Sequence, residues 1–147
     1  TTVLGQMAAT FGQPDSDSGT VIATGDFGAC PGDPIRVVRF GPLAIIIVDP
    51  DTSPVFAGYR LDLAFGNLES QAAALQTVSG LKAGDTIETL EAIYSGFDIE
   101  YEAAGDTGLV FRLSTQGGGL LLWGPVTSTE QDGRISGIYS PDSCLEA

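Results

Sequence analysis

The side chains in this sequence that could do chemistry are carboxylates. Asp98, Glu100 and Glu102 alternate with other residues, and alternation places side chains on one face of a β-strand. Two carboxyl groups about 5–10 Å apart form the catalytic pair of glycoside hydrolases. The same alternation is typical of a solvent-facing strand whose charges deter pairing with another sheet. We favour that structural interpretation. The sequence therefore predicts no catalytic residue, and a carboxylate-based hydrolase is kept only as an alternative.

Other catalytic and metal-binding chemistry is poorly represented. The chain has no histidine, which excludes Ser-His-Asp and Cys-His nucleophiles and argues against a zinc enzyme. Asp15 with Asp17, or Asp49 with Asp51, could give oxygen ligands to calcium, but neither pair lies in a loop of the EF-hand pattern. Gly117–Gly119 lacks a following Lys-Ser/Thr and predicts a hairpin turn rather than a phosphate loop. We expect no metal and no cofactor, with calcium as an open alternative.

The charge of the chain restricts its partners. The 19 Asp and Glu residues outnumber the six Lys and Arg residues, so the formal net charge is −13. Nucleic acid and anionic lipid both need clustered cations, so neither is an expected partner. An acidic solvated surface is the favoured explanation, and a cationic partner or a saline habitat are alternatives. The longest apolar runs, Leu43–Val48 and Leu120–Trp123, are far shorter than the roughly 18 residues of a membrane span.

The two cysteines, Cys30 and Cys144, predict one disulfide in an oxidising compartment. The Gly- and Pro-rich loop around Cys30 and the polar tail around Cys144 have few apolar residues to hold them in place. The sequence begins with Thr1 rather than Met, which is expected after removal of a signal peptide or where a longer sequence has been shortened. We therefore expect an extracellular or cell-envelope protein. Two unpaired thiols in a cytosolic protein are the alternative.

A helix is predicted after Gly80, where Asp85 can serve as N-cap and Glu88 can return the hydrogen bond from position N3. An apolar face then recurs at a spacing of three and four residues. Its members are Ile87, Leu90, Tyr94 and Phe97. Residues 1–15 repeat this pattern through Leu4, Met7 and Phe11. The repeated spacing indicates that the chain contains a duplicated unit.

The strands predicted after each helix also match in pairs. Residues 35–40 resemble 109–113, residues 43–48 resemble 120–123, and residues 55–61 resemble 134–139. The predicted fold class is α+β, with two tandem repeats that each place a short helix before about four antiparallel strands, and with the helices packed against the sheet. The predicted boundaries are repeat one at 1–61, a connector at 62–78 and repeat two at 79–147.

The repeat resembles a known family. Gly80-Leu-x-x-Gly84-Asp85-Thr86, a helix that ends in an aromatic residue, and a cysteine near the C-terminus are similar to the secreted bacterial tandem-repeat domains of the β-lactamase inhibitory protein type. Those domains are related in turn to SmpA/OmlA-like domains. The resemblance implies an α+β repeat, export, and action through protein contact. Two cysteines do not allow one disulfide in each repeat, and no inhibitor contact motif is present, so β-lactamase inhibition is a lesser alternative.

Aromatic side chains on the predicted strands are the candidate contact residues. They are Tyr59, Tyr101, Trp123 and Tyr139. Tyr and Trp on an open sheet face are typical of binding hot spots, although Trp123 would equally suit a hydrophobic core. We therefore expect an exported, non-enzymatic module that binds another protein or serves as an accessory subunit. The alternative is a structural subunit of an extracellular or envelope-attached assembly, including an assembly of identical copies.

Overall fold

The structure is a computed structural model, and it describes residues 2–65 and 71–142. The described residues form two compact units. The first takes its residues from Thr1–Arg60, Phe65–Ala73 and Asp142–Ala147, and the second consists of Leu61–Ala64 and Ala74–Pro141. The repeat boundaries at 1–61, 62–78 and 79–147 stay a prediction.

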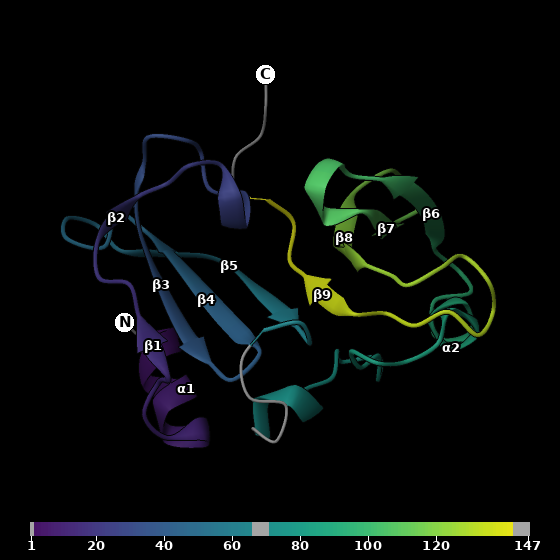
Figure 1. Cartoon of the computed structure of the whole chain (residues 1–147), viewed down its shortest axis with the longest axis horizontal. Coiled ribbons are helices and arrows are strands. Elements are labelled where there is room, and N and C mark those ends of the chain that lie inside the picture. The colour runs from purple at the N-terminus through teal and green to yellow at the C-terminus, as the bar shows by residue number, and fades with distance from the viewer. Residues whose placement is uncertain (1, 66–70, 143–147) are drawn as a thin grey trace. The chain divides into compact units, whose positions relative to one another are not determined.

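Figure 1 labels the elements. In chain order they are α1 (Thr2–Phe11), β1 (Ser16–Asp17), β2 (Val21–Ile22), a 3₁₀ turn (Asp26–Gly28), β3 (Pro34–Phe40), β4 (Leu43–Val48), β5 (Val55–Asp62), a second 3₁₀ turn (Gln71–Ala74), α2 (Ile87–Ile93), β6 (Asp98–Ala103), a third 3₁₀ turn (Gly105–Thr107), β7 (Leu109–Ser114), β8 (Leu120–Pro125) and β9 (Gly137–Tyr139).

The predicted fold class of two helix-plus-sheet repeats is wrong. One hydrogen-bonded strand order, β1-β3-β4-β5-β9-β8-β7-β6 with β2 also paired to β3, takes in all nine strands of the described residues. Among the described residues, only two short α-helices accompany this sheet. The last two residues of β5, Leu61 and Asp62, already belong to the second unit. A separate sheet for each repeat would leave two further strand edges with unpaired backbone groups, which the shared order avoids.

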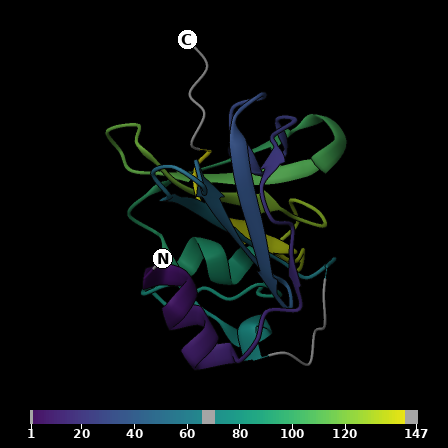
Figure 2. The same cartoon turned by 90° about the vertical axis from the view of Figure 1, so that its left-hand side faces the viewer.

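In the first unit, β3 and β4 pair antiparallel from Ile35 opposite Val48 to Phe40 opposite Leu43. One face of this pair is covered by the segment that includes the first 3₁₀ turn. That core contains Ala23, Ala29, Ile35, Val37, Ala44 and Ile46, with Phe27 packed against it. The Phe40 ring contacts Phe11 of α1, with ring centroids 6.2 Å apart. Figures 1 and 2 show α1, in purple, near the end of β3.

In the second unit, α2 packs its apolar side chains into a core with residues of β7 and β9. The buried members are Leu81, Ile87, Leu90, Tyr94, Phe111, Leu113, Val126, Ile135 and Ile138. The predicted N-cap is corrected: Thr86 caps α2 by accepting a hydrogen bond from the Thr89 N–H. The Asp85 carboxylate instead accepts from the Lys82 N–H. The helix ends at Ile93, so Phe97 lies beyond it and is 40% exposed.

Two local predictions in the second unit are confirmed. Asp98, Glu100 and Glu102 lie on β6, the last strand of the order, and all three are exposed. Glu102 is 3.4 Å from Arg112 on the neighbouring strand. Gly117–Gly119 forms the turn between β7 and β8, and the Thr115 hydroxyl accepts a hydrogen bond from the Gly119 N–H. These acidic side chains therefore line an open edge, as the structural interpretation expected.

Candidate functional site

The candidate site is a hollow of about 300 Å³ in the first unit. The two short strands β1 and β2, the strand β3 with which both pair, and the first 3₁₀ turn supply its lining. The apolar lining residues are Val21, Ile22, Ala23, Phe27, Ile35 and Val37. A volume near 300 Å³ is at the small end of the range for ligand pockets in proteins.

The hollow changes from apolar to cationic along β3. Ile35, Val37 and Arg39 are alternate residues of one strand, so they share a face of the sheet. Ser16 is directly opposite Arg39 across the β1–β3 ladder, and it also lines the hollow. One end of the site therefore has an aliphatic floor of Ile35 and Val37, which are 3% and 7% exposed, beside the exposed Val21 and Ile22. The other end has a guanidinium group with a hydroxyl beside it.

The Arg39 guanidinium lies over two aromatic rings. Its central carbon lies 5.4 Å from the ring centroid of Phe27 and 5.4 Å from that of Phe65. Such contacts orient an arginine without using its N–H donors. Within residues 2–65 and 71–142, Arg39 has no carboxylate within ion-pair distance. The other four arginines all have polar partners: Arg36 with Asp17, Arg60 with Asp142, Arg112 with Glu102, and Arg134 with the Gly84 carbonyl.

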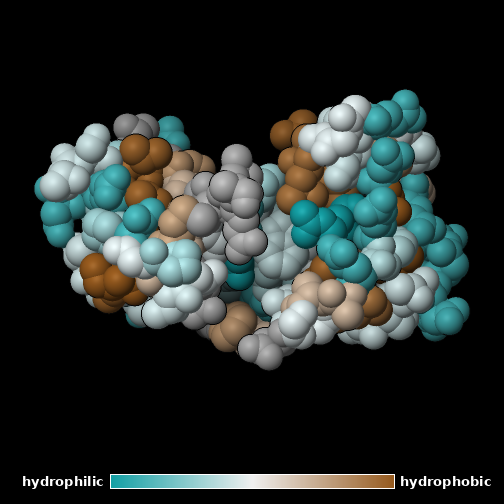
Figure 3. All heavy atoms as spheres, turned by 90° about the horizontal axis from the view of Figure 1, so that it is seen from above, coloured by the Kyte–Doolittle hydropathy of each residue, from teal (hydrophilic) through white to brown (hydrophobic). Residues whose placement is uncertain are grey.

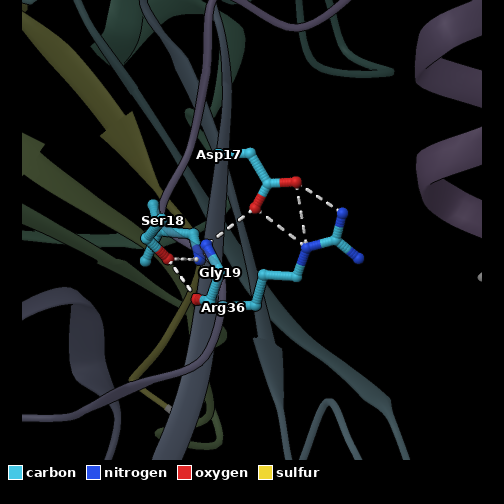
Figure 4. A network of polar contacts seen from close by, with 5 residues as sticks. Asp17, Ser18, Gly19 and Arg36 are labelled. Carbon is cyan, nitrogen blue, oxygen red and sulfur yellow. Dashed lines mark hydrogen bonds and ion pairs between the residues drawn. The ribbon is translucent and has the colours of Figure 1, made fainter.

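Arg36 and Asp17 form a two-pronged ion pair beside the hollow, as Figure 4 shows. The Arg36 Nε donates to Asp17 Oδ1 at 3.0 Å, and its Nη2 donates to Oδ2 at 2.5 Å. The Gly19 N–H donates to the same carboxylate at 3.0 Å. The hydrogen bond from Arg36, followed by that from Gly19, lowers the pKa of Asp17 to about 2. Asp17 is therefore ionised and occupied by Arg36, which leaves Arg39 as the available cation of the site.

The segment that carries the hollow is fixed by hydrogen bonds to β3. Ser18 Oγ accepts from the Val37 N–H at 2.8 Å and donates to the Gly19 carbonyl at 2.7 Å. The Ser18 N–H donates to the Val37 carbonyl at 3.0 Å. The polar stretch between β1 and β2 is therefore fixed to the edge of the sheet by these hydrogen bonds.

Phe27 has an unusual backbone for an aromatic residue. Its φ is 62° and its ψ is 15°, which is the left-handed region that bulky residues avoid. Such a conformation costs on the order of 1–3 kcal/mol and is found disproportionately at functional sites. The conformation directs the Phe27 ring to Arg39, and a second guanidinium, that of Arg60, lies 5.7 Å from the same ring.

Exposed apolar side chains extend the site beyond the hollow. Ile22 is 64% exposed and Val21 is 41% exposed, and both line it. Phe65, which contacts Arg39, is 53% exposed. Figure 3 shows hydrophobic residues reaching the surface in separate patches among hydrophilic ones. The apolar rim formed by Val21, Ile22 and Phe65 suits contact with a larger molecule, because exposed apolar surface next to a hollow is typical of binding sites.

Two of the four predicted contact aromatics are not on the surface. Trp123 is 8% exposed and Tyr139 is 5% exposed, and their rings meet edge to face with centroids 4.9 Å apart. The Tyr139 hydroxyl also donates to the buried carboxylate of Asp62. Both rings are therefore core residues, which corrects the prediction of a contact role and agrees with the core alternative for Trp123.

The other two predicted contact aromatics are partly buried. The Tyr101 hydroxyl donates to Glu91 at 2.8 Å, and burial together with this bond raises the pKa of Tyr101 above its ordinary value. Tyr59 lies on β5 in the first unit and is partly buried. The predicted disulfide has one end at Cys30, and Cys144 lies outside the described residues. No described cysteine is free, and the pairing itself stays a prediction.

The described residues offer no metal centre. No group of three or more His, Cys, Asp or Glu side chains in the described ranges is placed to hold a metal ion. Three of the four acids considered for calcium have other partners: Asp15 accepts from the Gly41 N–H, Asp17 accepts from Arg36, and Asp51 accepts from the Thr20 hydroxyl. In the same ranges, no helix is long and apolar enough to cross a membrane.

Sequence reasoning did not identify Arg39, Phe27 or Phe65 as site residues. A signal was present in Arg36-Val37-Val38-Arg39, where two arginines three apart must point to opposite faces of a strand. Only one of them could then meet Asp17. The other arginine, Arg39, contacts Phe27 and Phe65, and sequence periodicity does not connect those segments to β3.

Comparison with known proteins adds no relative: no protein-family model, curated protein or solved structure matches this chain.

Proposed function

We propose that this chain is an exported, non-enzymatic module that binds another protein, and that the hollow of the first unit is its contact site. The observation that supports the proposal is the combination of an open hollow with the exposed apolar rim of Val21, Ile22 and Phe65. Interfaces are dominated by a few apolar and aromatic anchors with an arginine among them, and Arg39 in contact with two phenylalanine rings is of that type.

Export to the extracellular space or the cell envelope is part of this proposal. It rests on the predicted Cys30–Cys144 disulfide, because disulfides form and persist in oxidising compartments. The resemblance to tandem-repeat inhibitor domains adds no support, because the two-repeat fold that it implies is wrong. Fold similarity does not identify a partner, so none is named.

The test compares binding by two variants with matched chemistry. Ile22→Asp places a charge on the rim, and Val78→Asp places the same charge on a fully exposed residue of the other unit. Proteins cross-linked to the native chain in its source are quantified for the wild type and for both variants. We expect a partner that is retained by Val78→Asp and reduced at least tenfold by Ile22→Asp. Equal recovery with all three proteins would place the contact elsewhere.

Self-assembly is the second candidate function, and it has a separate observation behind it. β5 begins with Val55 and Phe56, which are 56% and 42% exposed. Apolar side chains of this kind suit contact between identical copies. Sedimentation equilibrium over a hundredfold range of concentration tests this candidate, because a monomer throughout the range would exclude it. Concentration-dependent association that Phe56→Asp abolishes would favour it.

A further inference from the structure

We propose that the hollow recognises the C-terminus of a polypeptide, with the terminal carboxylate on Arg39 and an apolar last side chain against Val37 and Ile35. This inference rests on the proposed function, because it names the kind of segment that the contact site takes. The partner segment is a polypeptide that ends in an aliphatic or aromatic residue.

The first argument is the availability of the Arg39 cation. A guanidinium group binds a carboxylate through two parallel hydrogen bonds when its N–H donors face the ligand. The rings of Phe27 and Phe65 contact the Arg39 group by their π faces, and no carboxylate of the described residues pairs with it. Arg39 lines the hollow without a carboxylate partner among the described residues. In a chain with a formal net charge of −13, such an arginine is a specific place for an anion.

The second argument is the spacing between charge and apolar surface. Val37 and Arg39 are neighbours on one face of β3, so their Cα atoms lie about 7 Å apart. A C-terminal residue carries its carboxylate and its side chain on the same Cα, which matches this short spacing. The hydroxyl of Ser16, opposite Arg39, is placed to donate to the second carboxylate oxygen.

The third argument separates a polypeptide from a small organic acid. The hollow measures about 300 Å³, which suits the end of a chain better than a long segment. The exposed side chains of Ile22 and Phe65 add apolar surface outside the hollow. A small acid would leave that surface in water, whereas the residues before the C-terminus of a peptide would cover it.

The test uses four acetylated tetrapeptides that end in Val, Leu, Ile or Phe, each made with a free and with an amidated C-terminus. Each is titrated into the full chain while backbone amide shifts are followed by NMR. We expect at least one free-acid peptide to shift the amides of Val37, Arg39 and Ile22. Its amidated form should bind at least about tenfold more weakly. A charge-assisted hydrogen bond of ordinary strength gives a loss of at least this size.

Two variants assign the effect to Arg39. Arg39→Gln removes the charge and is expected to abolish the difference between the acid and the amide, while Arg39→Lys retains part of it. Arg112→Gln, which removes an exposed arginine of the other unit, is the matched control and should behave as the wild type. Amide spectra that are unchanged away from the hollow show that the variants are folded.

Each remaining outcome overturns the inference in a different way. Equal binding of acid and amide forms would exclude recognition of the C-terminus but leave the hollow as a contact site. Binding of 4-methylpentanoate as tightly as the best peptide would identify a small-acid site instead. Absence of shifts in the hollow with all four peptides would exclude the site for this ligand class. Partner loss in Ile22→Asp is measured separately, so the proposed function and this inference can fail independently.

Discussion

The Tyr139 hydroxyl donates a hydrogen bond to the Asp62 carboxylate inside the second unit. Asp62 is 7% exposed, and it is the one charged residue that is buried within the described ranges. Its other carboxylate oxygen accepts from the Ala64 N–H at 2.9 Å. A buried carboxylate is tolerated only when hydrogen bonds replace its water, so Tyr139 is required to hold Asp62 in the interior.

Tyr139→Phe should therefore destabilise the protein without disturbing its packing. The variant leaves one oxygen of a buried carboxylate without a partner, which costs about 1–3 kcal/mol. Tyr94→Phe is the matched control, because the Tyr94 hydroxyl is 2.8 Å from the neutral Thr77 hydroxyl rather than from a carboxylate. Urea unfolding at pH 7 should show a larger loss for Tyr139→Phe than for Tyr94→Phe. Equal losses would mean that Asp62 finds water or another donor.

The ion pair between Asp17 and Arg36 predicts a loss of stability in acid. Its hydrogen bonds lower the pKa of Asp17 from 3.8 to about 2. A lowered folded-state pKa stabilises the protein above pH 4, and this stabilisation is lost as the pH falls from about 4 to about 2. The Asp17 side chain is 35% exposed, so the contribution should be below about 1 kcal/mol.

Asp17→Asn should remove that pH-dependent contribution. Urea unfolding of the wild type and the variant at pH 7, 4 and 2 is expected to show a difference that shrinks toward pH 2. Asp98→Asn, on the exposed strand β6, should not produce this pattern. In about 1 M salt the difference at pH 7 should also shrink, because exposed charges are screened. A difference that is constant with pH would contradict the ion-pair explanation.

Substitution of Gly28, which follows Phe27 in the chain, is expected to destabilise the protein more than substitution of another glycine with a positive φ. Its φ is +73°, and an added Cβ would lie 2.9 Å from the Asp142 Cα. Gly32 also has a positive φ, +92°, but a Cβ there would meet nothing within 4 Å. Gly32→Ala should cost about 1–2 kcal/mol from the backbone alone, and Gly28→Ala about 1–3 kcal/mol more from the clash. Thermal unfolding measures both, and equal losses would exclude the close approach.

The sequence predicted local structure where one physical signal decides it. Apolar runs bounded by turn residues gave the strands at 43–48 and 120–123, and the three glycines gave the turn before Leu120. The end of α2 was less predictable, because Asp85 and Thr86 are both good caps and only packing selects one of them. A cap one residue later shortens the helix and leaves Phe97 outside it.

Pairing and site formation were not predictable in the same way. Periodicity shows that a segment is a strand, but it does not show which strand lies beside it, so the shared sheet was missed. Trp123 is buried and Phe65 is exposed, although both are large aromatic residues, so residue type alone does not predict which of them lies on the surface. The positive φ of Phe27 is imposed by its surroundings rather than by its residue type. These features depend on contacts between segments far apart in the sequence.

The Cys30–Cys144 disulfide remains a prediction, and the described residues next to its two ends support it. Asp142, two residues before Cys144, lies so close to Gly28 that a Cβ on Gly28 would be 2.7 Å from its Oδ1. Asp142 Oδ1 also lies 3.4 Å from the Arg60 Nη2. Gly28 in turn is two residues before Cys30, so the residues two positions before each cysteine lie in close contact.

Thiol titration of the unreduced, urea-unfolded protein should find no free thiol, and after reduction it should find two. Mass spectrometry of a digest should recover one peptide that links residue 30 to residue 144. Cys30→Ser should lower the free energy of unfolding by up to about 4–5 kcal/mol, since the bond closes a loop of more than a hundred residues in the unfolded chain. Arg60→Gln, which removes only the nearby ion pair, is the control and should cost less than about 1 kcal/mol. Two reactive thiols in the unreduced protein would exclude the bond, and the argument for an oxidising compartment would lose its main support.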